Sequence, residues 1–449
     1  MGEAVEKLLA MGAGGKGYEI SHANVHDLQI AALNERLHEQ KDKIRLVEFR
    51  ARDAGITAIK DFADVVPLLL PHTAYKSYPE NFLTEKRWDK LTKWLGTVST
   101  SSFENVDLSG VETIDEWVDC LQNAGHFVSC SSGTTGKSAM LAASRDDMDF
   151  TSQDAVDAFA WGAGVTPAQD RIMFGLAPVA AVSRNLLIRD ALEAAFCTPG
   201  VEAFRYPVPP ITVGSITDMI VLRKKIADGT AMPAELAHFE ATSAARAQAV
   251  DAAAGISADA LIAARGEKLY VSGMWATLYK VAEAVRAKGY AAGDFHPDNS
   301  LYVGGGLKGA QLPSDYREYV YETFNIKPER NYQMYGMQEI SSSMPLCQAG
   351  GRYHLPPWLI CLPLDREGDG LVPNAGGEIE GRAGFFDLSL DGRWGGVISG
   401  DRISVDFNPC ICGSASPSIR DDIVRFSDIE GDDKIGCSGT VDAYVRGVS

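Results

Sequence analysis

From about residue 120 to residue 335, strand-like apolar runs alternate with helix-like segments. Residues 171–176 and 269–273 are short apolar runs of the kind that form buried strands, and an amphipathic helical pattern follows the second run. The strand-like residues 301–303 and 331–335 continue the series, with a helical pattern between them. Such alternation is typical of a mostly parallel sheet between helices. The sequence therefore predicts an α/β fold.

The chain has 449 residues, enough for one large domain or two ordinary ones. We expect residues 1–110 to form a mostly helical N-terminal segment of the large domain and residues 111–420 a nucleotide- and acid-binding α/β domain. Residues 421–449 would be a short C-terminal tail. The alanine-rich stretch 234–264 is predicted to be helical and is a candidate insertion or lid. After Asp401 the chain is rich in Gly, Asp and Ser, so we expect no second large domain there.

Composition limits the partners and the compartment of this protein. The formal net charge is −18 at pH 7, which argues against a nucleic-acid or anionic-membrane partner. No apolar run approaches the length of a membrane span, and the acidic N-terminus lacks the apolar core of a signal peptide. We therefore expect a cytoplasmic protein whose 8 cysteines are reduced thiols or metal ligands.

A polar loop rich in glycines and hydroxyl side chains follows the strand-like residues 126–130 and precedes a helix-like segment near Asp146. Its residues are Ser131, Ser132, Gly133, Thr134, Thr135, Gly136, Lys137 and Ser138. Glycines let the backbone approach an anion, hydroxyls donate hydrogen bonds, and the lysine adds a point charge. The two glycines are too close together for the Walker A pattern. Between a strand and a helix, such a loop is a candidate phosphate cradle, and an ordinary Gly/Ser loop is the alternative.

Two further short motifs carry side chains suited to a nucleotide. Their residues are Tyr335, Gly336, Met337, Gln338 and Glu339 in the first motif, and Ser399, Gly400 and Asp401 in the second. The ring of Tyr335 offers a flat face to an adenine, and Glu339 can hold Mg²⁺. At a strand exit, the Asp401 carboxylate can accept hydrogen bonds from ribose hydroxyls. Taken singly, each motif fits a solvent-exposed turn equally well.

Together, the order and spacing of the three motifs resemble those of the adenylate-forming superfamily. Within it, the chain is most similar to the phenylacetate–CoA ligase and acyl-protein synthetase branch. The run Gly304-Gly305-Gly306-Leu307-Lys308 resembles the Gly-Gly-Gly-Trp-Lys element of the acyl-protein synthetases that serve bacterial luciferase. The end of the chain resembles the same proteins and related enzymes of phenazine-antibiotic biosynthesis. The resemblance implies the large N-terminal domain of an adenylate-forming enzyme that uses ATP and Mg²⁺ to activate a carboxylic acid.

The resemblance also implies roles for individual residues. Thr134, Thr135 and Lys137 of the polar loop would hold the β- and γ-phosphates. Glu339 would place Mg²⁺. The nucleoside would contact Tyr335, Gly336, Met337, Gln338 and Asp401, with Arg420 or Arg425 adding a ribose or phosphate contact. The acid, aryl or medium-to-long acyl, would lie against Ser272, Trp275, Gly304, Gly305 and Gly306.

Two departures from the superfamily pattern affect the mechanism. Members usually carry a mobile C-terminal domain with a lysine at the carboxylate and α-phosphate, but Lys434 is the one lysine after Asp401. We therefore expect that domain to be absent or vestigial, and Lys308 becomes the leading candidate to neutralise charge there. The luciferase-associated synthetases carry an acyl-accepting cysteine near the terminus, where this chain has Val448. The acyl group is then expected to pass to an external thiol of CoA, a carrier protein or a partner reductase.

The rival hypothesis is a non-catalytic nucleotide-binding regulatory protein that retains the fold. It is motivated by the missing domain and by Gln338, where many relatives have threonine.

A set of thiol and imidazole side chains predicts a metal site. Cys347, His354, Cys410 and Cys412 form a Cys-x₆-His and Cys-x-Cys arrangement, and three thiolates with one imidazole suit tetrahedral Zn²⁺. Phenylacetate–CoA ligase relatives show a similar layout. The site would be structural because four protein ligands leave no open position. Buried free cysteines are the alternative.

Overall fold

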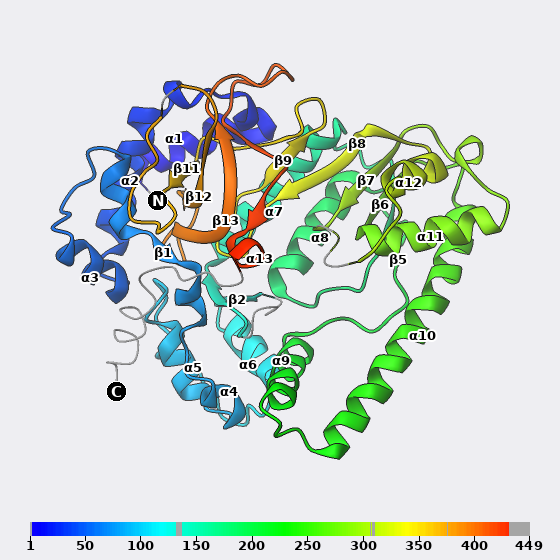
Figure 1. Cartoon of the computed structure of the whole chain (residues 1–449), viewed down its shortest axis with the longest axis horizontal. Helices are drawn as coiled ribbons and strands as arrows, with labels where there is room; N and C mark the ends of the chain where they lie inside the picture. Colours follow the sequence, from blue (N-terminus) through cyan, green and yellow to red (C-terminus); the bar gives the residue numbers. More distant parts are fainter. Residues whose placement is uncertain (1, 132–136, 306, 308–309, 375, 431–449) are drawn as a thin grey trace. The chain divides into compact units, whose positions relative to one another are not determined.

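The computed structural model describes residues 2–131, 137–305, 307, 310–374 and 376–430 (Figure 1). The chain divides into two compact units, each assembled from separate stretches of sequence. Unit 1 comprises Met1–Asp154, Val182–Arg184 and Gly336–Ser449, and unit 2 comprises Ala155–Ala181 and Asn185–Tyr335. None of the helices within the described ranges is both long and apolar enough to cross a membrane.

Unit 2 is built on a parallel sheet with the strand order β5-β4-β6-β7-β8. The strands are β4 (Ile172–Leu176), β5 (Phe204–Arg205), β6 (Leu269–Gly273), β7 (Asn299–Val303) and β8 (Ile326–Tyr335). The helices are α8 (Ser183–Phe196), α9 (Val213–Ala227), α10 (Pro233–Ala263), α11 (Trp275–Ala287) and α12 (Tyr316–Phe324), with a 3-10 turn η5 (Ala292–Asp294). The sequence-based prediction of a parallel sheet alternating with helices is confirmed for this unit.

The core of unit 2 forms where the sheet meets α10, α11 and α12. Strands β6 and β7 supply buried apolar residues such as Val271 and Leu301. Helix α11 buries Leu278, Val281 and Val285, whose three- and four-residue spacing places them on one face. This packing fixes the carboxyl ends of the parallel strands along one edge of the sheet.

Helix α10 confirms the predicted helix in the alanine-rich stretch. Proline at its first position has the fixed backbone angle that a helix start requires. The buried residues all lie in its second half, from Ala253 to Leu261, where it packs against α11. Figure 1 shows the first half of α10 continuing beyond α11. A role as insertion or lid stays a prediction.

Unit 1 contains a sheet that is mostly antiparallel, in the strand order β11-β12-β13-β14-β10-β9. These strands are β9 (Met344–Cys347), β10 (Arg352–His354), β11 (Leu359–Leu364), β12 (Ile379–Asp387), β13 (Gly396–Asp406) and β14 (Ser418–Arg420). Strand β1 (Leu70–Pro71) pairs parallel to β13, and β15 (Val424–Arg425) pairs antiparallel to it. The expectation of mostly parallel sheets is therefore wrong for unit 1. The connections here, such as 348–351 between β9 and β10, are too short for a parallel crossover.

Helices of unit 1 come mainly from the N-terminal third of the chain. They are α1 (Glu3–Gly12), α2 (His26–Gln40), α3 (Arg45–Asp53), α4 (Asn81–Thr84), α5 (Trp88–Leu95), α6 (Ile114–Asn123), the start of α7 (Arg145–Ala163) and α13 (Phe426–Glu430). Short 3-10 segments are η1 (Ala13–Glu19), η2 (His22–Asn24), η3 (Phe62–Leu68) and η4 (His72–Lys76). Of the predicted tail, residues 431–449, with Lys434, Cys437 and Val448, lie outside the described residues.

Candidate functional site

The polar loop lies between two strands. Strands β2 (Phe127–Cys130) and β3 (Met140–Ala143) pair antiparallel, with Cys130 opposite Met140, and α7 begins only after β3. The prediction that the loop joins a strand directly to a helix is therefore wrong, because Met140–Ala143 forms a strand that the sequence analysis overlooked. Four consecutive buried residues gave that strand no alternation to recognise. Loop residues Ser132, Gly133, Thr134, Thr135 and Gly136 lie outside the described residues.

Ser131 closes the base of the loop. Its backbone N–H donates to the Ala139 carbonyl (3.1 Å), and its Oγ accepts from the Ala139 N–H (2.8 Å). Together these two bonds hold the ends of the loop side by side. The Ser131 hydroxyl thus already has a structural partner on the far side of the loop.

Lys137 is held by a residue from the N-terminal segment. Its Nζ donates to the Tyr78 carbonyl (2.6 Å) and lies 5.3 Å from the centre of the Tyr78 ring. The Tyr78 hydroxyl in turn donates to the Ser138 carbonyl (2.8 Å). Burial raises the pKa of Tyr78, so the phenol stays protonated as a donor. Tyr78 therefore fixes the C-terminal end of the polar loop.

The segment before Tyr78 is joined to the strand that carries Asp401. Strand β1 runs parallel to β13 with Leu70 opposite Val397 and Pro71 opposite Ile398. The Trp394 Nε1–H donates to the Leu68 carbonyl (2.9 Å), and the Tyr75 hydroxyl donates to the Trp394 carbonyl (3.3 Å). Residues 68–78 thus connect the polar loop with β13.

Buried arginines hold the backbone of the Tyr335–Glu339 motif. The Arg393 Nη2 donates to the carbonyls of Gln338 (3.1 Å) and Glu339 (3.2 Å), and its Nη1 donates to the Ala142 carbonyl on β3 (2.9 Å). Arg184 donates to the Gln338 carbonyl (3.5 Å). Arg393 therefore ties the strand after the polar loop to the motif that contains Glu339.

Asp387, at the end of β12, fixes the residues that follow Glu339. This fully buried carboxylate accepts hydrogen bonds from the N–H groups of Ser341 (2.7 Å) and Ser342 (3.0 Å), and from the Ser342 hydroxyl (2.9 Å). Glu339 itself is 8% exposed. A buried carboxylate next to a fixed backbone is suited to a divalent cation. The Gln338 Oε1 is buried and has no hydrogen-bond partner among the described residues.

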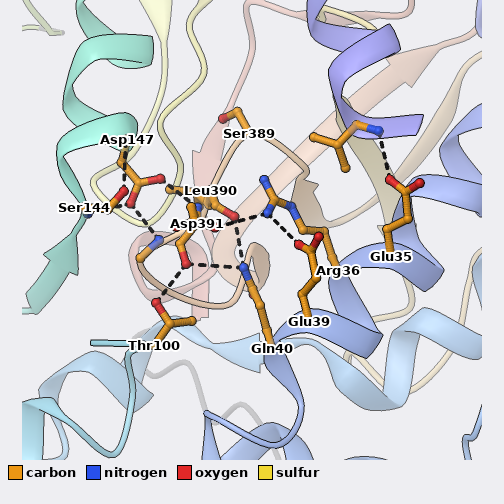
Figure 2. Close-up of polar contacts among 12 residues, drawn as sticks. Glu35, Arg36, Glu39, Gln40, Thr100, Ser144, Asp147, Ser389, Leu390 and Asp391 are labelled. Carbon is orange, nitrogen blue, oxygen red and sulfur yellow. Dashed lines mark hydrogen bonds and ion pairs between the residues drawn. The ribbon is translucent and has the colours of Figure 1, made fainter. Parts of the chain in front are cut away.

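The turn that precedes Arg393 is fixed from several sides (Figure 2). Asp147 accepts from the N–H groups of Asp391 (2.7 Å) and Gly392 (2.8 Å), and Gln40 donates to the Leu390 carbonyl (3.2 Å). Thr100 donates to the Asp391 carbonyl (2.9 Å). A Cβ at position 392 would lie 2.6 Å from an Asp147 oxygen, so only glycine permits this approach. The turn therefore fixes the position from which the Arg393 side chain reaches Ala142, Gln338 and Glu339.

Asp401 lies in β13, opposite Arg425 of β15. The two side chains form an ion pair with a separation of 3.7 Å, and the Asp401 N–H donates to the Ser399 hydroxyl (2.9 Å). Arg420 instead pairs with Glu378. The sequence had named both arginines as candidates, and the structure places Arg425 next to Asp401.

Unit 2 carries the residues predicted to contact adenine and the acid. Ser272, Gly304 and Tyr335 lie at or just beyond the carboxyl ends of β6, β7 and β8. The carboxyl ends of parallel strands are the usual place for a ligand. The Gly304 N–H donates to the Gly273 carbonyl (3.0 Å), and Gly305 has a φ of 85° that favours glycine.

Trp275 is part of the core of unit 2. The side chain is 2% exposed and packs edge-on against the rings of Tyr316 and Tyr321. The ring centres lie 5.1 Å and 6.1 Å away, respectively. Its presence therefore gives no preference for an aromatic acid. Gly306 and Lys308 lie outside the described residues.

Cys347, His354, Cys410 and Cys412 form a cluster in unit 1, as the sequence predicted. Their ligand atoms all lie within 4.8 Å of one another. Imidazole Nδ1 of His354 contacts the hydroxyls of Ser416 (2.8 Å) and Ser414 (3.1 Å), and its Nε2 lies 3.5 Å from the Cys412 Sγ. The serine hydroxyls thus orient the ring so that Nε2 faces the thiols, as in metal sites with a second layer of hydrogen bonds.

Burial keeps the His354 imidazole in the form that can bind a metal. Burial, assisted by the charge of Arg352, lowers the pKa of His354 to about 4, so the ring is neutral at pH 7. Burial also raises the pKa of the Cys412 thiol. The tight turn at Gly350 brings the backbone to the sulfurs, since a Cβ there would lie 2.5 Å from the Cys410 Sγ. The donor set and spacing fit tetrahedral Zn²⁺.

Three residues of this site were missed by the sequence analysis: Tyr78, Arg184 and Arg393. None belongs to a recognisable motif. Arg393 and Trp394 shortly precede Ser399–Asp401, which was their one available signal. The other two, Tyr78 and Arg184, act through contacts between distant parts of the chain.

Compared by sequence, the chain matches no protein-family model and none of the curated proteins. Compared by structure, it resembles 2-hydroxyisobutyryl-CoA ligase. For an open conformation in complex with 2-HIB-AMP and CoA, the TM-score is 0.52 at 14% identity over 91% of this chain and 76% of that one. For the same ligase in the thioesterification state, the TM-score is 0.52 at 14% identity, over 91% of this chain and 70% of that one. For the postadenylation state with R3-HIB-AMP it is 0.51 at 14% identity, over 92% and 73%. The prediction of an α/β fold is thus confirmed, and this chain shares its fold with 2-hydroxyisobutyryl-CoA ligase.

Proposed function

We propose that this protein activates a carboxylic acid with ATP. A carboxylate oxygen attacks the α-phosphorus of Mg·ATP, the bond to the bridging oxygen breaks, and pyrophosphate leaves with that electron pair. The observation that carries the proposal is the connection of three motifs within unit 1. Lys137, Glu339 and Asp401 belong to segments joined by Tyr78, Arg393 and the pairing of β1 with β13. The fold shared with 2-hydroxyisobutyryl-CoA ligase supports it.

The proposed roles follow from the chemistry of each side chain. Lys137, with Thr134 and Thr135, holds the β- and γ-phosphates. Glu339 places Mg²⁺, because a buried carboxylate is a preferred oxygen ligand for that ion. Asp401 binds the ribose and is assisted by Arg425, its ion-pair partner. Tyr335 stacks on the adenine. Lys308 remains a candidate to neutralise charge where the carboxylate of the acid meets the α-phosphate.

The proposed second step transfers the acyl group to an external thiol. The thiolate attacks the acyl carbon, AMP leaves, and a thioester results. CoA is the favoured acceptor because the structures with the same fold are of a CoA ligase. A carrier protein or a partner reductase would use the same chemistry. An aryl acid and a medium-to-long acyl acid are both retained as substrate classes.

The test is acid-dependent exchange of labelled pyrophosphate into ATP, with a panel of aryl and acyl acids. We expect exchange with at least one acid. Glu339→Gln and Asp401→Asn should each lower its rate by at least ~10²-fold, the typical effect of removing one preorganised group. Glu380→Gln, on an exposed position of β12, is the control and should exchange normally. Binding of ATP without exchange for any acid would favour the non-catalytic regulatory alternative.

We also propose that Cys347, His354, Cys410 and Cys412 bind one structural Zn²⁺. The support is the distance of at most 4.8 Å between any two ligand atoms and the neutral, serine-oriented imidazole. Four protein ligands complete a tetrahedral shell, so the ion would stabilise the fold and take no part in the reaction.

A further inference from the structure

Lys76 occupies a central position in unit 1 that no motif marks. It is the last residue of η4, which packs against both β3, the strand after the polar loop, and β13, the strand with Asp401. Its neighbours anchor it on either side. Tyr75 donates to the Trp394 carbonyl (3.3 Å), and Tyr78 donates to the Ser138 carbonyl (2.8 Å). The backbone of Lys76 is therefore fixed between two of the nucleotide motifs.

The ammonium group of Lys76 is half-buried among charges of the proposed nucleotide site. Burial, the largest effect, lowers its pKa, the Glu339 carboxylate raises it, and the Arg425 guanidinium lowers it. Arg425 is the ion-pair partner of Asp401. The Lys76 charge thus lies within electrostatic reach of the group proposed to hold Mg²⁺ and of the pair proposed to hold the ribose.

The covalent order of ATP indicates which part of the nucleotide lies between Glu339 and the Asp401–Arg425 pair. The ribose is joined to the α-phosphate, and the β- and γ-phosphates follow, with the metal on the phosphate oxygens. A lysine on η4, between the strand after the polar loop and the strand with Asp401, can therefore reach the α-phosphate that lies between these two ends. We propose that Lys76 is a further catalytic residue, which contacts the α-phosphate and neutralises its charge as the carboxylate oxygen approaches. This inference rests on the proposed function.

The experiment compares the charge-removing variant Lys76→Met with the charge-keeping variant Lys76→Arg. Methionine retains an unbranched apolar stem, so the packing of η4 should survive. Acid-dependent pyrophosphate exchange should fall by at least ~10²-fold in Lys76→Met and recover in part in Lys76→Arg. Lys60→Met removes an exposed lysine from the same N-terminal segment and should exchange at the wild-type rate. Folding of each variant is checked by its melting temperature.

A second measurement separates this inference from the proposed function. Mg·ATP binding without acid should weaken by at least ~10-fold in Lys76→Met and stay unchanged in Lys60→Met. Wild-type protein that exchanges no pyrophosphate with any acid would contradict the proposed function, yet this binding difference would still support Lys76 at the phosphates. A folded Lys76→Met with wild-type exchange and binding would overturn the inference. If that variant does not fold, Lys76→Gln takes its place with the same two measurements, and a folded Lys76→Gln with wild-type exchange and binding overturns the inference.

Discussion

Arg393 is a buried cation whose hydrogen bonds go to backbone carbonyls of two separate segments. It reaches Ala142 on β3, and Gln338 and Glu339 of the Tyr335–Glu339 motif. Hydrogen bonds from a charged donor are stronger than neutral ones, and buried carbonyls left without donors are costly. This one side chain therefore contributes both to stability and to the position of Glu339.

Arg393→Met should lower the free energy of unfolding by at least ~2 kcal/mol, because it removes a charged donor from the buried carbonyls of Ala142 and Glu339. Urea denaturation followed by circular dichroism measures the change. Arg402→Met is the matched control: the Arg402 side chain on β13 is partly exposed and pairs with exposed Glu380 at 3.6 Å, so its loss should change stability by less than ~0.5 kcal/mol. Equal effects of the two substitutions would contradict the role given to Arg393.

At the scale of elements, the Cys/His cluster connects strand β9, strand β10 and the segment 410–416. Cys347 ends β9, His354 ends β10, and Cys410 and Cys412 lie in the connection from β13 to β14. The strands themselves are short, and β10 has only 3 residues. Coordination of one ion by all three elements would hold this end of the sheet together.

We expect purified protein to contain about one zinc per chain, and a strong chelator to lower its melting temperature. Cys412→Ser should lose most of the metal, because serine is a poor zinc ligand. Cys120→Ser should keep the metal, since the Cys120 Sγ contacts the Asp107 carbonyl at 2.9 Å in another part of unit 1. Metal-free protein with an unchanged melting temperature would show that the cluster is a group of free thiols.

At the scale of the whole molecule, the acyl acceptor distinguishes a CoA ligase from a self-acylating synthetase. The self-acylating synthetases that the sequence resembles carry an acceptor cysteine where this chain has Val448, and valine cannot form a thioester. With labelled acid, ATP and CoA, the label should appear in acyl-CoA and leave no hydroxylamine-sensitive label on the denatured chain. Cys437→Ala should not change this result. Label retained on the chain but lost in Cys437→Ala would show that the acceptor lies in the tail.

The sequence by itself determined the parallel sheet of unit 2, the helix at 233–263 and the four residues of the Cys/His cluster. Local patterns suffice for these, because periodicity, propensity and ligand type are properties of short segments. Antiparallel pairing in unit 1, by contrast, depends on which short connections bring strands together, and the alternation that predicts parallel strands ends at Tyr335.

Only the tertiary structure showed that Arg425 pairs with Asp401, that Trp275 belongs to the core, and that Tyr78 holds Lys137. It likewise placed Lys76 between β3 and β13. Each of these relations joins residues on different elements, in most cases far apart in the chain. Side chains of this kind carry no periodic signal, because their partners are set by the packing of whole elements.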